Sequence, residues 1–246
     1  MNAMERLYIK QVMIKPIQER TYLTGLPVVK WLQKAKKLDF TSNVTFFVGE
    51  NGTGKSTIIE AIAICAGFNA EGGSKNFNFS TKQTSSNLHN YLTLSKAAHE
   101  KDGFFLRAES FYNVATQVDD LRLDLGGYGG QSLHCQSHGE SFMSLVQNRF
   151  RGSGLYILDE PEAALSPSRQ MTLLTEIKRL ADKDSQFIIA THSPILLAYP
   201  GATIYEITQG GLKSVKYEQC EHYSLTKQFL DQPGRMIHYL FDDDAT

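Results

Sequence analysis

The sequence predicts an α/β fold with a mainly parallel sheet. Two observations predict it: strand-like runs alternate with helical patterns along the chain, and the runs at 44–48, 155–158 and 187–190 are almost entirely apolar. Strands that alternate with helices form parallel sheets, and strands buried on both faces lack polar positions. Residues 6–14 alternate apolar and polar side chains instead, so we expect an antiparallel strand there.

The first third of the chain divides into elements with clear ends. A helix begins at Pro27, a residue type favoured in the first helical turn. The strand at 44–48 is followed by a helix at 55–66 whose isoleucines lie on one side. Residues 69–87 are rich in Gly, Ser, Asn and Lys, which indicates a polar loop.

The rest of the chain continues the alternation. We expect, in order, a helix at 88–94, a strand at 104–106, a helix at 111–123, a glycine-rich hinge at 126–130, a helix at 141–149, the strand at 155–158, a helix at 168–181, the strand at 187–190 and a helix from Ser193. Residues 203–207 and 213–217 predict a hairpin. No internal repeat or linker is visible, so we expect one domain over residues 1–246.

Composition excludes several classes of protein. Lys and Arg number 25 and Asp and Glu 26, giving a net charge of −1, which excludes a strongly basic nucleic-acid binder by bulk charge. No apolar run approaches the ~20 residues that span a bilayer, and the opening residues do not resemble a secretory signal. We therefore expect a soluble, cytoplasmic protein.

The three cysteines do not form a disulfide framework, because they are few, odd in number and far apart. They fit a reducing compartment. One cluster, formed by His134, Cys135 and His138, could supply metal ligands. A structural zinc site usually takes four ligands in two short pairs, and no second pair follows.

The strongest motif is GENGTGKST at residues 49–57, a full G-x-x-x-x-G-K-[ST] phosphate loop between a predicted strand and a predicted helix. Its glycines let the backbone N–H groups turn inward onto phosphate oxygens. We expect Lys55 to reach the β- and γ-phosphates of a nucleotide and the Ser56 hydroxyl to bind Mg²⁺. The expected nucleotide-binding residues are Asn51, Gly52, Thr53, Gly54, Lys55, Ser56 and Thr57.

Two carboxylates follow the strand at 155–158. Asp159 is the candidate Mg²⁺ ligand. Glu160 is the candidate general base, because a carboxylate at a strand's carboxyl end can orient and polarise an attacking water. The alternative is an acidic helix cap, since Glu160 and Glu162 would also suit a helix N-terminus.

Two further features accompany these motifs. His192 follows the strand at 187–190 and could reach the γ-phosphate or its water, although a lone histidine is more often structural. Ser137, His138, Gly139 and Glu140 precede the helix at 141–149. They could bind phosphate at a helix N-terminus or form a simple capping box between Ser137 and Glu140.

Together these motifs resemble the ATP-binding-cassette (ABC) ATPase superfamily. The order is phosphate loop, signature at 137–140, Walker B at 155–160, D-loop at 164–166 and switch histidine at 192. The phrases FFVGENGTGKST, YILDEPEAALSP and IIATHSPILLAYPGA look most like soluble AAA-family ATPases related to the RecF, SMC and OLD groups. Transporter cassettes usually carry LSGGQ, whereas here His138 replaces a glycine and Glu140 the glutamine.

The resemblance implies a P-loop NTPase fold with an antiparallel β subdomain and a small helical lid at about 70–150. It implies a homodimer that sandwiches ATP and Mg²⁺ between the phosphate loop of one copy and the Ser137–Glu140 signature of the other, with Lys55, Glu160 and His192 as catalytic residues. The family's metal-linked glutamine has no match, and Glu109 is the nearest polar candidate ligand. Tyr22 is the candidate adenine-stacking residue, with Arg20 as an alternative.

We therefore expect a soluble ATP hydrolase that serves DNA repair, defence or another process through a partner protein or DNA. The main alternative is the nucleotide-binding subunit of a membrane ABC transporter. A binding switch with little turnover and another P-loop class, such as a kinase or a ring-forming AAA+ protein, remain open.

Overall fold

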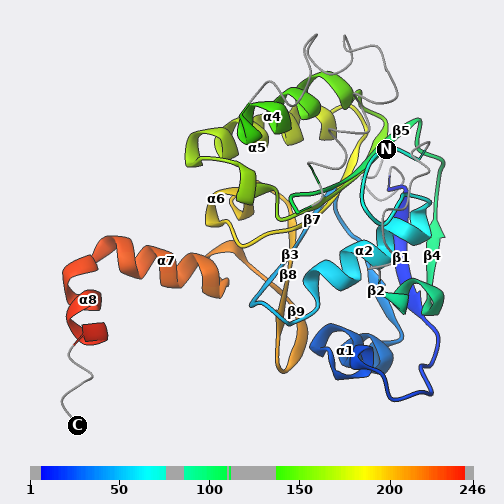
Figure 1. Ribbon diagram of the computed structural model, residues 1–246, viewed down its shortest axis with the longest axis horizontal. Coiled ribbons are helices and arrows are strands. Elements are labelled where there is room, and N and C mark those ends of the chain that lie inside the picture. The colour runs from blue at the N-terminus through cyan, green and yellow to red at the C-terminus, as the bar shows by residue number, and fades with distance from the viewer. Residues whose placement is uncertain (1–6, 76–85, 110, 112–136, 242–246) are drawn as a thin grey trace.

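The computed structural model describes residues 7–75, 86–109, 111 and 137–241, and within them the chain forms two sheets (Figure 1). In the larger sheet every neighbouring pair is parallel except the last, where β9 runs antiparallel to β8. The predicted mainly parallel sheet is confirmed. Its strands, in spatial order, are β5 (Asp102–Arg107), β6 (Gly154–Asp159), β7 (Gln186–Ala190), β3 (Val44–Gly49), β8 (Thr203–Thr208) and β9 (Gly211–Val215).

The smaller sheet is antiparallel and confirms the expected antiparallel subdomain. Its order is β2 (Lys37–Asp39), β1 (Ile9–Ile14) and β4 (Leu92–Lys96). The buried Gln186 side chain joins the two sheets, because its amide accepts from the backbone N–H of Ile9 at 2.8 Å and donates to the Ile9 carbonyl at 2.9 Å. The subdomain is thus held to the start of β7.

The prediction of a helix at 88–94 is wrong. The segment forms a short 3₁₀ helix, η3 (Asn87–Tyr91), and then enters β4. Leu92 is buried and Thr93 exposed, and both pair with β1 in antiparallel register. Pairing with β1 satisfies the backbone of this segment and overrides its weak local helical pattern.

Helices cover both faces of the larger sheet (Figure 1). One core contains α1 (Pro27–Ala35) and α2 (Lys55–Ala66) with the antiparallel sheet. The other core contains α4 (His138–Arg149), α5 (Pro167–Ala181) and the short α6 (Pro194–Leu197). Neighbouring strand residues alternate between them: Phe46 packs with the second core and Phe47 with the first. Short 3₁₀ turns also occur, namely η2 (Tyr22–Gly25), η6 (Pro161–Ala164) and η7 (Tyr217–Gln219).

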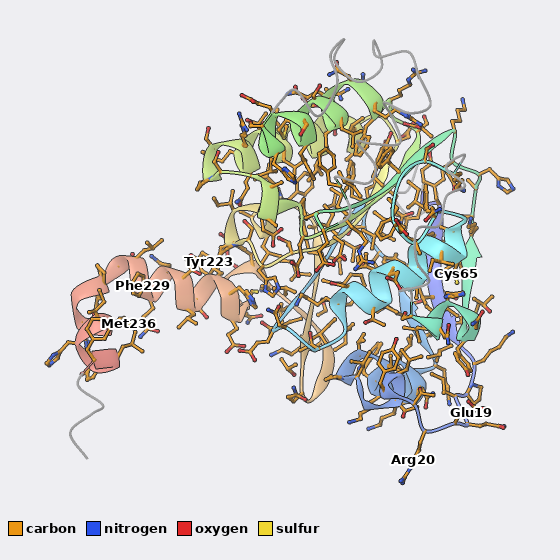
Figure 2. The ribbon with its side chains drawn as sticks, in the orientation of Figure 1. Glu19, Arg20, Cys65, Tyr223, Phe229 and Met236 are labelled. Carbon is orange, nitrogen blue, oxygen red and sulfur yellow. The ribbon has the colours of Figure 1, made fainter. Side chains whose placement is uncertain are left out.

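Two C-terminal helices project from the body as an arm that the sequence analysis did not anticipate (Figure 1). They are α7 (Glu221–Asp231) and α8 (Pro233–Phe241), and neither contains a buried residue. Figure 2 shows Phe229 and Met236 out on this arm. Exposed apolar side chains gather along it, namely Leu225, Phe229, Leu230, Ile237, Tyr239, Leu240 and Phe241.

Some expectations lie outside the described residues. They are the glycine-rich hinge at 126–130, His134 and Cys135, and the helix at 111–123 apart from Phe111. The lid expected at about 70–150 is described only in part, by η3, β4, β5 and α4. Among the helices that the structure describes, none is long and apolar enough to cross a membrane.

Candidate functional site

The strand register brings the candidate residues to one edge of the larger sheet. Asp159, the last residue of β6, pairs with Arg107 at the end of β5 and with Ala190 at the end of β7. The phosphate loop begins at Gly49, where β3 ends beside Ile207 of β8. Because parallel strands end on the same edge, loops far apart in the sequence meet there.

The phosphate loop adopts a backbone that only glycine fits at two positions. Gly49 has φ +148°, and a Cβ there would lie 2.2 Å from the Ile207 carbonyl oxygen. Gly54 has φ +97°, and its Cβ would lie 2.6 Å from a methyl carbon of Val28. α2 begins directly after Gly54, so its free N–H groups face the loop.

Lys55 is the buried cation of the loop, with only 4% of its surface exposed. Its Nζ donates to the carbonyl oxygens of Gly49 at 2.7 Å and Glu50 at 3.1 Å. Burial lowers the pKa of its ammonium group, while the carboxylates of Glu160 and Asp159 partly restore it. The side chain is therefore pinned across the loop, beside two acidic groups.

A cavity of about 280 Å³ lies over the loop. Thr53 does not line it: Thr53 is buried, and its hydroxyl donates to the Glu50 carbonyl at 2.7 Å, which shapes the turn. The other six expected loop residues do line the cavity, and its lining consists of Leu26, Asn51, Gly52, Gly54, Lys55, Ser56, Thr57, Glu109 and Glu160.

Ser56 and Asp159 form an oxygen pair suited to Mg²⁺. The Ser56 hydroxyl donates to Asp159 Oδ1 at 3.1 Å, which joins the start of α2 to the end of β6. Burial raises the pKa of Asp159 to about 6 despite the nearby Arg107 guanidinium, and a divalent cation would favour the charged carboxylate. Mg²⁺ is commonly held by one or two protein oxygens plus substrate phosphates, so this donor set fits it.

Arg107 is a site residue that the sequence analysis missed. Its guanidinium contacts three carboxylates: Glu60 of α2 at 2.7 Å, Glu109 at 3.5 Å and Asp159 at 3.5 Å. Glu60 is buried and also accepts the Ser86 backbone N–H at 2.7 Å. Arg107 therefore neutralises a cluster of acidic groups at the cavity. Its position directly after an apolar strand is the only sequence signal for it.

Replacing Arg107 with methionine is expected to lower the free energy of unfolding by about 3 kcal/mol, because it leaves the buried Glu60 carboxylate without its cation. Chemical denaturation of the purified variant measures this. Lys178→Ala removes an ion pair that is exposed on α5 and should leave the unfolding midpoint nearly unchanged. An Arg107→Met midpoint equal to that of Lys178→Ala would contradict the structural role of Arg107.

Glu160 has a strained backbone, with φ +52° and ψ +50°. A residue other than glycine in this region costs roughly 1–2 kcal/mol and is often found at functional sites. Its N–H donates to the Ala190 carbonyl at 2.9 Å, which holds it against β7. Its carboxylate lines the cavity, with Oε1 3.5 Å from Nε2 of His192.

His192 lies just past the end of β7 and is held there through its backbone. Its N–H donates to Glu162 Oε1 at 2.5 Å, and the Thr191 hydroxyl donates to Glu162 Oε2 at 2.8 Å. On its far side, Nδ1 lies 2.9 Å from Nε2 of His222. Burial lowers the pKa of His192, and the Lys55 ammonium lowers it further. The imidazole is therefore neutral near pH 7.

The Ser137–Glu140 segment begins α4 and forms the capping box expected from the sequence. Ser137 donates to Glu140 Oε2 through its backbone N–H at 3.0 Å and its hydroxyl at 2.6 Å. Arg169 of α5 also contacts Glu140, at 3.1 Å. A Cβ on Gly139 would lie 2.7 Å from the Ala164 carbonyl oxygen, so the segment packs tightly against the loop before α5. Ser137, His138 and Glu140 are exposed, and none lines the phosphate-loop cavity.

The candidates for adenine stacking and for the metal-linked glutamine lie in different surroundings. Tyr22 in η2 is 66% exposed and does not line the cavity, whereas Leu26, four residues later, does. Arg20 is exposed at the molecular edge (Figure 2). Glu109 lines the cavity and contacts Arg107.

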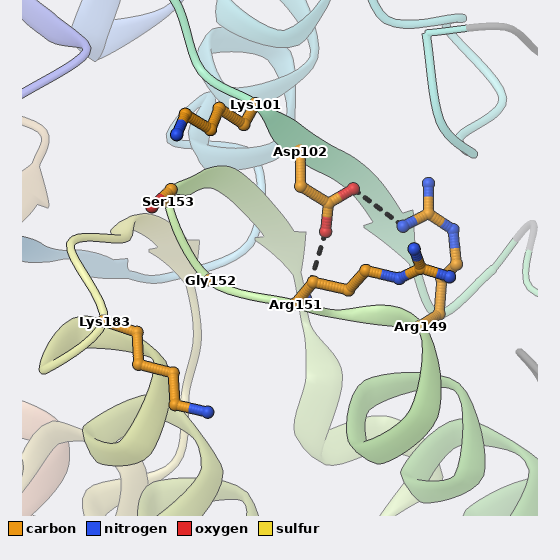
Figure 3. Close-up of a pocket in the computed structure, with 7 residues that line it drawn as sticks. All are labelled: Lys101, Asp102, Arg149, Arg151, Gly152, Ser153 and Lys183. Carbon is orange, nitrogen blue, oxygen red and sulfur yellow. Dashed lines mark hydrogen bonds and ion pairs between the residues drawn. The ribbon is translucent and has the colours of Figure 1, made fainter.

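A second cavity, of about 690 Å³, lies where β5 and β6 begin, at the opposite end of the strands from the phosphate loop (Figure 3). Asp102 accepts hydrogen bonds there from Arg149 at 2.7 Å, the Arg151 N–H at 3.1 Å and the Tyr156 hydroxyl at 2.8 Å. Burial raises the pKa of Asp102, but these bonds outweigh it and lower the pKa overall. This network fixes the end of α4 to the sheet and is separate from the candidate site.

The family of the chain follows from a comparison with family models. A model described as an AAA domain matches residues 29–187, more than half of the chain. The chain belongs to this AAA-domain family. The match spans the phosphate loop, the signature and the Walker B strand, and ends just before His192.

A short segment of the chain is similar to a chromosome-maintenance protein. Over 34 residues the chain is 56% identical to structural maintenance of chromosomes protein 6 from Dictyostelium discoideum. That segment is 14% of this chain and only 3% of the relative's length.

Two solved structures show the same fold. One is an Smc head bound to the C-winged helix domain of ScpA. The two chains are 15% identical, the match covers 85% of this chain and 98% of that chain, and the TM-score is 0.50. The other is cbiO1 from Clostridium perfringens, part of the ABC transporter complex cbiONQ. The two chains are 15% identical, the match covers 94% of this chain and 99% of that chain, and the TM-score is 0.51. The fold that the resemblance to ABC and SMC-type proteins implied is therefore confirmed.

Proposed function

We propose that the protein binds ATP with Mg²⁺ in the phosphate-loop cavity and hydrolyses it. The observation that carries this proposal is the convergence of three strand ends. Ser56 lies 3.1 Å from Asp159, and Glu160, which lines the same cavity, lies 3.5 Å from His192. Phosphoryl transfer depends on positioning and charge stabilisation more than on covalent chemistry, and these residue types supply both.

Each residue has a role that its surroundings support. The N–H groups of the loop and Lys55 would bind the phosphates. Ser56 and Asp159 would hold Mg²⁺, which neutralises charge on the β- and γ-phosphates when bound. Glu160, partly exposed at the cavity, would accept a proton from the attacking water. His192 would orient Glu160 or contact the γ-phosphate through Nε2.

We further propose that two copies assemble head to tail. Ser137, His138 and Glu140 are exposed and do not line the cavity of their own chain, so a phosphate contact by Ser137 needs a second copy. A C₂ arrangement gives two equivalent sites. The proposed setting is a soluble, cytoplasmic ATPase that serves DNA repair, defence or another process through a partner protein or DNA. The binding of ScpA by an Smc head of the same fold supports a partner.

A transporter subunit is the second candidate, because cbiO1 belongs to an ABC transporter complex. The departure from the usual transporter signature at His138 and Glu140 favours the first candidate. Recovery of a multi-span membrane protein with the affinity-purified chain would reverse this preference.

Ser137→Arg tests the signature in trans. The variant is expected to bind ATP as the wild type does, because Ser137 does not line the cavity. It should lose dimerisation and turnover, because a large cation would occupy the proposed interface. Binding is measured with a fluorescent nucleotide, turnover by phosphate release and dimerisation by light scattering.

A matched control separates this effect from a loss of stability. Ser137 caps α4, and losing the cap costs about 1 kcal/mol, so unfolding is followed for each variant. Gln147→Arg places the same charge on an exposed residue near the far end of α4, and it should leave dimerisation and turnover unchanged. Normal turnover by folded Ser137→Arg would rule out the signature role.

A further inference from the structure

The first turn of α7 joins the C-terminal arm to the residues around the candidate site. Cys220 just before the helix is buried, and the Glu221 N–H donates to Glu206 Oε1 of β8 at 2.9 Å. Beside it, the Tyr217 hydroxyl donates to the Pro194 carbonyl at 3.0 Å. Beyond this turn, α7 projects from the body (Figure 1). The first turn of α7 is thus seated against the residues that follow β7.

His222 lies in this first turn and contacts His192. Nε2 of His222 is 2.9 Å from Nδ1 of His192, and the ring centroids are 5.0 Å apart. The other nitrogen of His192, Nε2, lies 3.5 Å from Glu160 Oε1. A chain of side chains therefore runs from α7 through His192 to the proposed general base.

The surroundings determine which nitrogen of each ring carries a proton. Burial lowers the pKa of both histidines, and the Lys55 ammonium lowers both further, so both rings are neutral near pH 7. In a hydrogen-bonded pair of neutral rings, one nitrogen donates and the other accepts. Two arrangements are then available.

If His192 donated from Nδ1, its Nε2 would be a bare lone pair facing the Glu160 carboxylate. His222 would then carry its proton on Nδ1, which is buried and has no hydrogen-bond partner among the described residues. A buried unpaired N–H is costly. If His222 donates from Nε2 instead, His192 carries its proton on Nε2, toward Glu160, and His222 Nδ1 is only an unpaired acceptor, which is less unfavourable.

We propose that His222 is a positioning residue: its Nε2–H donates to His192 Nδ1, and this bond keeps the His192 proton on Nε2, directed at Glu160. The role in turnover rests on the proposed ATP hydrolysis, whereas the ring arrangement does not. A neutral His192 with a fixed Nε2–H can donate a hydrogen bond at the site throughout the reaction. Moving the first turn of α7 would remove that constraint, so the arm is coupled to the site through the contact between His222 and His192.

The first experiment reads the tautomer directly in the nucleotide-free protein. Nitrogen-15 NMR of labelled histidines distinguishes protonated from unprotonated ring nitrogens, and His192→Gln assigns the signals. We expect His192 to be protonated on Nε2 in the wild type and in His222→Gln, because glutamine retains an N–H donor. We expect a tautomer mixture in His222→Leu. A wild-type His192 protonated on Nδ1, or a tautomer unchanged by His222→Leu, would overturn the proposal.

The second experiment measures ATP turnover. His222→Leu should lower kcat about tenfold, the effect of losing one orienting hydrogen bond, with KM nearly unchanged. His222→Gln should recover most of kcat, and His99→Leu, at an exposed histidine, should match the wild type. Combined with His192→Ala, His222→Leu should cause no further loss, because His222 acts only through His192.

The outcomes separate the two proposals. A further loss of kcat in the His192→Ala background, or equal loss in His222→Gln and His222→Leu, would overturn the positioning role. A wild-type protein with no ATP turnover would overturn the proposed function instead. The NMR result would still decide whether His222 sets the His192 tautomer.

Discussion

Lys55→Ala is expected to lower the affinity for ATP by about 100-fold or more, which amounts to a loss of binding at ordinary nucleotide concentrations. Truncating a buried, hydrogen-bonded charge that faces an anion costs roughly 2–5 kcal/mol, and each 1.4 kcal/mol is about tenfold in affinity. Lys55 is only 4% exposed and is already pinned across the loop by the carbonyls of Gly49 and Glu50. The side chain therefore loses little conformational freedom when it binds phosphate. Truncation then removes the full favourable interaction between the ammonium group and the phosphate.

Isothermal titration with ATP and Mg²⁺ measures this effect. Removing Lys55 also leaves two loop carbonyls without its N–H donors, so unfolding is measured in parallel to show that the variant is folded. Lys10→Ala removes an exposed lysine from β1 and should bind ATP as the wild type does. A folded Lys55→Ala protein that retained micromolar-range affinity would show that the cavity is not a phosphate site.

Glu160→Gln is expected to bind ATP but to reduce kcat by about 1,000-fold, within the range that general bases contribute. The amide has the shape of the carboxylate but cannot accept the proton of the attacking water. The backbone at φ +52° accepts glutamine as it accepts glutamate, so the loop after β6 should keep its geometry. Because hydrolysis would no longer reopen the ATP-bound assembly, dimers should accumulate with ATP.

Single-turnover phosphate release and light scattering with and without ATP test both halves of this expectation. Glu176→Gln makes the same chemical change on α5, where Glu176 pairs with Arg179, and should leave turnover unchanged. Undiminished turnover by Glu160→Gln would mean that another group is the general base. A variant that stayed monomeric with saturating ATP would instead contradict the head-to-tail dimer.

Much of the candidate site was predictable from local sequence. The phosphate loop requires glycines at Gly49 and Gly54 because neighbouring atoms leave no room for a side chain. Asp159 and His192 were recognisable because each closely follows an apolar strand, and parallel strands end on a common edge. These features depend on residues close together in the chain, so a short window of sequence contains them.

Other features could not be predicted because they depend on distant partners. The segment at 88–94 becomes a 3₁₀ turn and a strand because β1 lies beside it. Arg107 ends its strand just as Asp159 does, but its partner Glu60 lies on another element. His222 carries no local signal, because its contact with His192 spans 30 positions of the chain.

The fold class and the set of chemical groups follow from the amino-acid sequence alone, because strand–helix alternation and the phosphate-loop motif are local patterns. Which groups meet depends on the folded chain, which brings together Ser56 and Asp159, Glu160 and His192, and His192 and His222. Sheet register and the packing of the first turn of α7 set these side-chain distances to within the length of a hydrogen bond. Contacts of that precision arise from packing across the whole chain and leave no periodic trace in the residues that make them.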